Sequence, residues 1–255
     1  IYMGDWSSDV CSSDLVHINA GIAALVCALV LGPRRGFPAT PMAPHSLPLC
    51  VAGAGMLWVG WFGFNAGSAL AANGSAGMAM LVTHLGASSG ALAWMVTEWW
   101  RYGRPSILGI VTGMVAGLGT ITPASGYVGP GGAIVIGAAA GFVCFFATNF
   151  LKRKLQIDDS LDVSPVHGVG GVLGTLLTGV FAAVPLGGAG FALDHSMGQQ
   201  IVVQLLGILA AIVWCGGMTW VILKLVGAMV GLRVPEDQET QGLDLTTHGE
   251  RGYGP

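Results

Sequence analysis

The sequence predicts an all-α protein that crosses a membrane several times. Charged residues make up only 9% of the chain, whereas soluble domains carry about 25%. The long uncharged segments are apolar all round, as membrane helices are and amphipathic surface helices are not. Cut at their polar and Gly/Pro breaks, these segments give spans of about the 20 residues that a bilayer requires. The predicted spans are 16–32, 48–72, 76–99, 105–123, 130–151, 163–184 and 199–231.

We divide the chain into three parts. Residues 16–231 form the transmembrane domain, and residues 232–255 form a short polar tail. Residues 1–15 form no domain: DWSSDVCSSDL (Asp5–Leu15) resembles one reading frame of a common sequencing-library adapter. This leader lacks the basic, apolar and small-residue regions of a signal peptide. We therefore expect the natural chain to be cut just before Val16.

The basic residues predict the orientation of the chain in the membrane. All ten Lys and Arg residues fall on one side of the predicted spans, and the loops on the other side (72–77, 122–129 and 185–198) contain none. Cytoplasmic loops carry an excess of Lys and Arg. We therefore expect this side, and the C-terminus with it, to be cytoplasmic in the inner (plasma) membrane. The first span then starts outside, which suggests further helices upstream.

Two histidines stand at the start of apolar spans. His17 lies in VHINAGI and His167 lies in VHGVGGV, and in both a Gly follows four residues after the His. The first span runs inward and the second runs outward, so the two segments are antiparallel, as in an inverted repeat. An ionisable group within a span is costly and usually lines a polar path. We therefore interpret these two histidines as functional, and His84, which has no counterpart, as a packed residue.

Aromatic residues gather in WVGWFGFNAGSALAAN, at the outer half of the second span. Trp58, Trp61, Phe62 and Phe64 are typical of an interfacial aromatic belt. Phe64 and Ser68 are four residues apart and share a helix face. Such a face can also attract a small cation through the aromatic ring and the hydroxyl oxygen. Periodicity alone leaves both alternatives open.

Five segments together resemble the ammonium transporter (Amt) family and occur in the family's order. They are VHINAGIAALV, WFGFNAGSA, ITPASGYVGPGGA, DVSPVHGVGGVLGTLLTG and GLRVPEDQETQGLDLTTHGE. The resemblance implies an all-α polytopic membrane fold of eleven helices, built as an inverted-repeat bundle with a last long helix. It places helices five to eleven in this chain, and it implies a homotrimer.

The resemblance also assigns site residues. His17 and His167 match the paired histidines that line the substrate-conducting pore. Phe64 matches a gate residue above the pore, and Ser68 matches the hydroxyl of the external ammonium-recruiting site. Trp61 lies in the same motif but receives no role. Asp162 matches an acidic residue before the second histidine, for which helix N-capping is the physical interpretation.

The implied function is transmembrane transport of ammonium or ammonia. Because a bare cation in a dry pore is expensive, ammonium is expected to be recruited outside and deprotonated, so that neutral ammonia crosses. The alternatives are an ammonium sensor of the same family, a Rhesus-type gas channel, and a metalloenzyme. Metal sites need three or four ligands, and no further ligand accompanies the two histidines. We therefore expect no enzyme activity, cofactor or metal, and no nucleic-acid partner.

The polar tail permits two interpretations. Its composition is compatible with a disordered, solvated end. The resemblance instead implies an ordered regulatory tail that packs on the cytoplasmic face near Arg34–Arg35 and Lys152–Lys154. It also implies that a PII-type signalling protein docks on that face.

Overall fold

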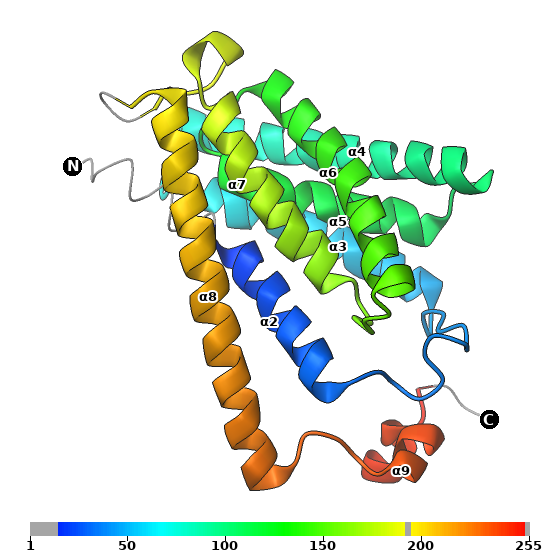
Figure 1. The fold of residues 1–255 in the computed structure, drawn as a ribbon. Helices are drawn as coiled ribbons and strands as arrows, with labels where there is room; N and C mark the ends of the chain where they lie inside the picture. Colours follow the sequence, from blue (N-terminus) through cyan, green and yellow to red (C-terminus); the bar gives the residue numbers. More distant parts are fainter. Residues whose placement is uncertain (1–14, 192–194, 253–255) are drawn as a thin grey trace.

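The computed structural model describes residues 15–191 and 195–252, and every regular element in these residues is a helix (Figure 1). The predicted leader therefore lies outside the described residues except for Leu15. The α-helices are α2 (Val16–Leu31), α3 (Leu47–Gly67), α4 (Gly74–Tyr102), α5 (Ile107–Ile121), α6 (Pro130–Asn149), α7 (Gly170–Phe181), α8 (Met197–Val230) and α9 (Glu236–Gln241). The shorter helical turns are η1 (Thr122–Ala124), η2 (Phe150–Lys154), η3 (Ser164–Val169), η4 (Val184–Leu186) and η5 (Asp244–His248). The all-α prediction is confirmed.

The described helices include 6 that are long and apolar enough to cross a membrane. These are Leu47–Gly67, Gly74–Tyr102, Ile107–Ala124, Pro130–Lys154, Ser164–Phe181 and Met197–Val230. The helix α2 is also apolar but shorter, with 16 residues. Each predicted span therefore coincides with one apolar helix, as expected of a multi-pass membrane protein.

Side-chain caps explain where several of these helices begin. Asn73 accepts a hydrogen bond from the Ala76 N–H at 3.1 Å, so α4 begins before the predicted position. It also ends later than predicted, at Tyr102. The next residue, Gly103, has a φ of 76°, in the left-handed region that glycine adopts easily. Ser46, Ser106 and Ser196 cap α3, α5 and α8 in the same way.

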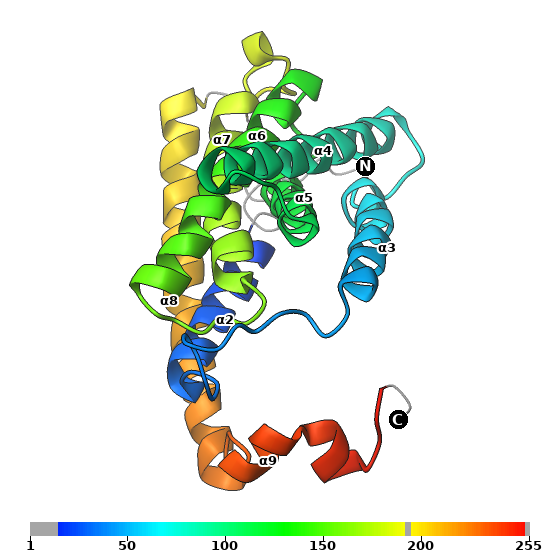
Figure 2. The ribbon, with the colours of Figure 1, turned by 90° about the vertical axis from the view of Figure 1, so that its right-hand side faces the viewer.

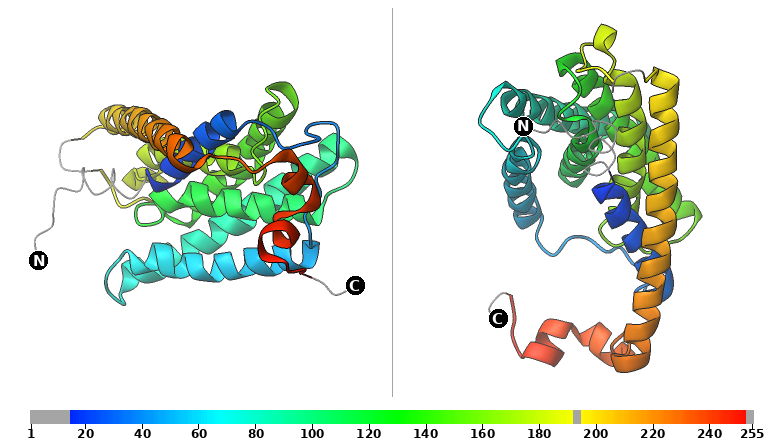
Figure 3. Two further views of the ribbon diagram at one scale, coloured as in Figure 1. Left: turned by 90° about the horizontal axis from the view of Figure 1, so that it is seen from below. Right: turned by 90° about the vertical axis from the view of Figure 1, so that its left-hand side faces the viewer.

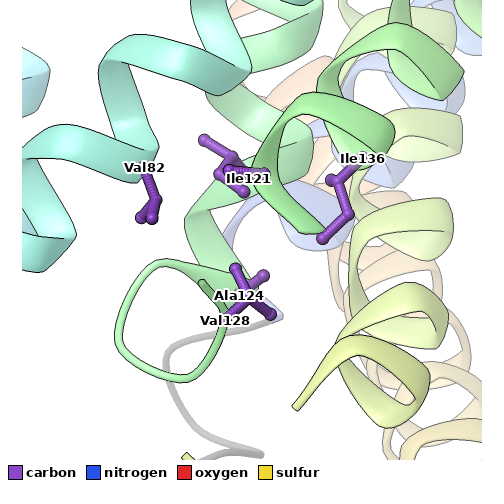
Figure 4. Packing of buried hydrophobic residues seen from close by; sticks show 6 residues of the cluster. Val82, Ile121, Ala124, Val128 and Ile136 are labelled. Carbon is purple, nitrogen blue, oxygen red and sulfur yellow. The ribbon is translucent and has the colours of Figure 1, made fainter. Parts of the chain in front are cut away.

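The helices α4, α5 and α6 pack closely through glycine. A Cβ atom on Gly117 or Gly137 would collide with the backbone of Gly86, and one on Gly141 would collide with that of Gly90. Small residues at spacings of four thus allow the backbones to approach, as they do in other membrane helices. At one end of these helices lies a buried apolar cluster (Figure 4). It contains Val82, Ile121, Ala124, Val128, Ala133 and Ile136.

The remaining helices stand on two sides of this packed centre. The long helix α8 runs beside α2 and α7, whereas α3 lies on the other side against α4 and α5 (Figures 1 and 2). The N-terminal half of α2 packs against η3 and α7. After α8, the tail passes below the bundle towards the side of α3 (Figures 2 and 3). The start of α2 and the turn η3 therefore meet in the interior, between α8 and α3.

Candidate functional site

The two histidines that the sequence singles out are in direct contact. His17 Nδ1 lies 3.2 Å from His167 Nδ1, and the rings are stacked with centroids 5.3 Å apart. His17 is 7% exposed, and His167 is partly buried. Because both contacting atoms are ring nitrogens, one must donate and the other must accept a hydrogen bond. The two rings can therefore share one proton, which lies between the two Nδ1 atoms.

Glycine at the fourth position after each histidine makes this contact possible. Gly21 faces the backbone of Gly168, and a Cβ atom on Gly21 would collide with it. Gly171 in turn faces Ile18 and the Cβ of His17. Each glycine therefore packs against the segment of the other helix that contains its histidine. The repeated pattern in the sequence thus corresponds to one antiparallel helix crossing. The pattern sets how closely the two histidine backbones approach.

Trp61 forms a wall of the site, a role that the sequence did not reveal. Its ring stacks on His17 with centroids 5.2 Å apart and an interplanar angle of 19°. Its Nε1–H donates to Thr122 Oγ1 at 2.8 Å, and the Thr122 hydroxyl donates to the Leu118 carbonyl. Trp61 stands three residues before Phe64 and so on the same helix face. That spacing is the signal that could have identified it.

Phe64 and Ser68 lie on the predicted outer side of the histidine pair. The Phe64 ring is 50% exposed and approaches His17 edge-on, with centroids 6.4 Å apart. The Ser68 hydroxyl donates to the Phe64 carbonyl at 2.8 Å. Both residues line an outer cavity of about 730 Å³. The polar residues that line it with Ser68 are Asn65, Asn73, Ser75, Thr122, Ser125 and Tyr127.

A second cavity, of about 510 Å³, adjoins His17 and is almost entirely apolar. It is open on one side, where the lining residue Met56 is 76% exposed. Its walls are Trp61 and Phe64 together with small and aliphatic residues of α3. Phe64 lines both cavities. The polar outer cavity and the open apolar cavity therefore meet at this ring, beside the histidines.

Asp162 does not cap the helix that carries His167. The bond to the first backbone N–H comes from Asp159, whose Oδ2 accepts from Ser164 N at 2.6 Å. Asp162 has a left-handed φ of 57° and pairs with Lys152 at 2.7 Å. The N-cap prediction for Asp162 is corrected in this respect, since the backbone turn directs its carboxylate to η2. Burial raises the pKa of Asp162, although the Lys152 ammonium opposes this shift.

His84 is not a buried packing residue either. Its side chain is exposed, and its ring stacks on Trp58 with centroids 5.2 Å apart. Phe62 lies on the same side, at a centroid distance of 6.2 Å. These three residues form a group on α3 and α4 that is separate from the lining of the two cavities.

On the predicted cytoplasmic side, the α2–α3 loop joins the tail to the segment before His167. Arg34 binds Asp158 through its backbone N–H and its guanidinium, at 2.7 to 2.8 Å. The Arg34 guanidinium lowers the pKa of Asp158. Arg35 donates its backbone N–H to Glu239 at 3.0 Å, and Arg233 pairs with the same carboxylate at 2.8 Å. These hydrogen bonds lower the pKa of Glu239.

The tail contact therefore differs in part from the prediction. The tail does contact the Arg34–Arg35 loop, because Arg35 donates hydrogen bonds to Glu239 and Thr240. The basic residues of η2 have other partners: Lys152 pairs with Asp162, Arg153 lies over the Tyr102 ring and Lys154 lies over the Phe150 ring.

Comparisons with known proteins agree on one family. The family model described as Ammonium Transporter Family matches residues 2–253. The chain is 48% identical to an ammonium transporter of Aquifex aeolicus over 249 residues, which are 98% of this chain and 58% of that protein. It is 43% identical to ammonium transporter Amt1 of Archaeoglobus fulgidus, over 99% of this chain and 65% of that protein.

Solved structures give the same result. The chain superposes on a protein named Sensor Amt Protein with a TM-score of 0.86 and 30% identity, over 95% of this chain and 62% of that one. It superposes on Saccharomyces cerevisiae Mep2 with a TM-score of 0.78 and 38% identity, over 91% of this chain and 55% of that one. The chain thus spans between about half and two thirds of the length of these relatives. The chain belongs to the ammonium transporter family.

Proposed function

We propose that the full-length protein transports ammonium or ammonia across the inner (plasma) membrane. The observation that carries this proposal is the contact between His17 Nδ1 and His167 Nδ1, at 3.2 Å, directly below an outer cavity lined by polar side chains. A cation can be accepted in that cavity, whereas the second cavity, at His17, is apolar. The chain's family and the names of its curated relatives point to the same substrate.

The mechanism follows from the order of these surfaces. Ammonium is recruited at Ser68, where the hydroxyl oxygen retains lone pairs because its proton is donated to the Phe64 carbonyl. The exposed Phe64 face attracts the cation at close range. A charged group in the apolar space beyond is costly, so the substrate gives up a proton to the external water before it passes Phe64. His17 and His167 then offer a donor and an acceptor to neutral ammonia, or relay a proton between helices.

The assembly and its control form the second part of the proposal. The protein works as a homotrimer, with its C-terminus in the cytoplasm and residues 232–255 as a regulatory tail. A PII-type signalling protein docks on the same face. Support comes from the ordered contacts of Glu239 with Arg35 and Arg233, which attach the tail to the α2–α3 loop. Sensing is not proposed as the main function, since the curated relatives described above are named transporters.

The test is uptake of ammonium and methylammonium by an uptake-deficient host that expresses the full-length protein from its source locus. We expect saturable uptake, and a strong loss of the rate in His17→Ala and in His167→Ala. The matched control is His84→Ala, which removes a histidine of the same membrane region outside the cavity linings and should leave uptake unchanged. Absence of saturable uptake by the full-length protein, at normal membrane abundance, contradicts the proposed function.

A further inference from the structure

Three hydroxyl groups that line the outer cavity have already donated their protons. Ser68 donates to the Phe64 carbonyl, Thr122 to the Leu118 carbonyl, and Ser125 to the Thr122 carbonyl at 3.1 Å. A hydroxyl that donates its single proton retains only acceptor lone pairs. These side chains therefore face the cavity as acceptors, which suits a ligand that carries only N–H donors.

Asn65 is a buried polar residue of the same cavity, with 4% of its surface exposed. Its Nδ2 lies 2.9 Å from Thr83 Oγ1, and the Thr83 hydroxyl donates to the Ala79 carbonyl at 2.6 Å. Thr83 can therefore only accept from Asn65, which requires the amide NH₂ to point towards Thr83. This chain of hydrogen bonds therefore determines which end of the Asn65 amide faces Thr83.

The other end of this amide is a carbonyl that remains available. Asn65 Oδ1 accepts no hydrogen bond within the described part of the chain, although Asn65 borders the cavity. Asn65 lies in the last turn of α3 and Ser68 is its C-cap residue, three positions later and still helical in backbone, so the two lie on neighbouring positions of one helix face.

We propose that Asn65 Oδ1 is a second acceptor for ammonium beside Ser68, held in place by Thr83. This inference rests on the proposed function and names a residue that binds its substrate. Ammonium presents four N–H donors in a tetrahedral arrangement, and one hydroxyl and one aromatic face do not satisfy all of them. A fixed carbonyl at the cavity wall compensates for a lost water at the moment when the cation is partly dehydrated.

The proposal also predicts a preference among amines. Methylammonium has one N–H donor fewer than ammonium. When it binds, one acceptor of the outer cavity can be left without a hydrogen bond, which weakens its binding relative to ammonium. Asn65 should therefore contribute to discrimination between the two substrates. A residue that only supports the fold would change the two KM values together.

The test measures KM and the maximal rate of uptake for both substrates in the full-length protein. We expect Asn65→Leu to raise the KM for ammonium about tenfold, the effect of losing one hydrogen bond to a charged group, and to change the maximal rate less than twofold. The ratio of the methylammonium KM to the ammonium KM should fall towards one. Thr83→Val should raise the ammonium KM by a smaller factor, because it frees the amide without removing it, whereas Thr83→Ser should behave like the wild type.

The matched control is Thr112→Val. Thr112, like Thr83, donates its hydroxyl proton to the carbonyl four residues earlier, at 2.7 Å, but it lies outside the lining of the two cavities. The KM for ammonium should not change in this variant. An unchanged ammonium KM in Asn65→Leu, or a loss confined to the maximal rate, overturns the proposal. The proposed function still stands in that case, provided that the wild-type protein shows saturable uptake. If Asn65→Leu does not reach the membrane, an unchanged KM in Thr83→Val overturns it.

Discussion

Gly21 and Gly168 face each other without side chains where α2 crosses the turn that carries His167, and this crossing positions the histidine pair. The contact is not symmetric. A Cβ atom on Gly21 would collide with the Gly168 backbone, whereas a Cβ atom on Gly168 would lie 3.3 Å from the nearest atom of Gly21. The Cβ atom on Gly21 can be accommodated only if one helix moves, whereas the Cβ atom on Gly168 needs a shift of only a few tenths of an ångström.

The first prediction uses this asymmetry. Gly21→Ala should destabilise the full-length protein by about 1–3 kcal/mol, as overpacked sites do, and should strongly reduce ammonium uptake because the histidines separate. Gly168→Ala adds the same methyl group on the opposite side of the crossing and should have a clearly milder effect on both. The measurements are the thermal unfolding temperature of the purified protein in detergent and uptake at equal membrane abundance. Equal effects of the two substitutions would contradict the crossing geometry.

The second prediction concerns Trp61 as a positioning residue for His17. Thr122→Val leaves the buried Trp61 Nε1–H without its acceptor, which should destabilise by about 1–3 kcal/mol. It should also reduce the rate of uptake, since the stacked ring is no longer held. Trp61→Leu removes the ring itself and should reduce uptake further. Thr122→Ser retains the hydroxyl and serves as the control. If Thr122→Val transports like Thr122→Ser, the Trp61 hydrogen bond has no role in positioning His17.

The third prediction is a pH dependence of the Arg34–Asp158 ion pair. Arg34 lowers the pKa of Asp158 in the folded protein, so the stabilisation is fully present above the ordinary Asp pKa of about 3.9 and is lost as the pH falls through the lower folded value. Asp158→Asn should therefore have a lower unfolding temperature than the wild type at pH 7. The difference should shrink only below about pH 4.

The control for this pair is Glu236→Gln. Its partner Arg35 is 3.3 Å away, but both side chains are more than half exposed, and exposed pairs contribute little to stability. Its unfolding temperature should match that of the wild type at every pH. A difference between Asp158→Asn and the wild type that persists unchanged to pH 2 would show that the carboxylate charge is not the cause.

The sequence could predict those features that depend on neighbours along one helix. The apolar spans and the His-x-x-x-Gly repeat both have a helical period, and the repeat explains why His17 and His167 meet. The N-cap of η3 could not be predicted. Asp159 and Asp162 both precede Ser164, and the left-handed backbone at Asp162 decides which carboxylate reaches it. Such a dihedral angle is set by tertiary contacts such as the Lys152 pair.

Residues that act across helices were also missed for a physical reason. Trp61 stacks on a histidine of another helix and binds a threonine 61 residues away. In the sequence it is one of several aromatics that an interfacial belt would explain equally well. The lack of a counterpart segment predicts His84 to be a packed residue, yet it lies exposed beside Trp58.

The fourth prediction concerns the tail. Glu239 accepts hydrogen bonds from the Arg35 backbone and from the Arg233 guanidinium, and Arg35 continues directly into Arg34, which holds the segment before His167 through Asp158. Deletion of 233–255 should therefore reduce transport by the full-length protein although no residue of the two cavities is removed. Glu239→Gln should reproduce part of this loss, because a neutral amide weakens both contacts.

The matched variant for the point substitution is Asp237→Asn, which removes a charge of the same sign from the same short helix. It should transport like the wild type. The measurement is methylammonium uptake at saturating substrate, normalised to the amount of protein in the membrane, with the KM determined in parallel. Because the cavities are untouched, the maximal rate should fall and the KM should remain constant. Unchanged uptake after deletion of 233–255 would make the tail a passive end, and a change in KM alone would place its action at the outer cavity instead of at the histidine segment.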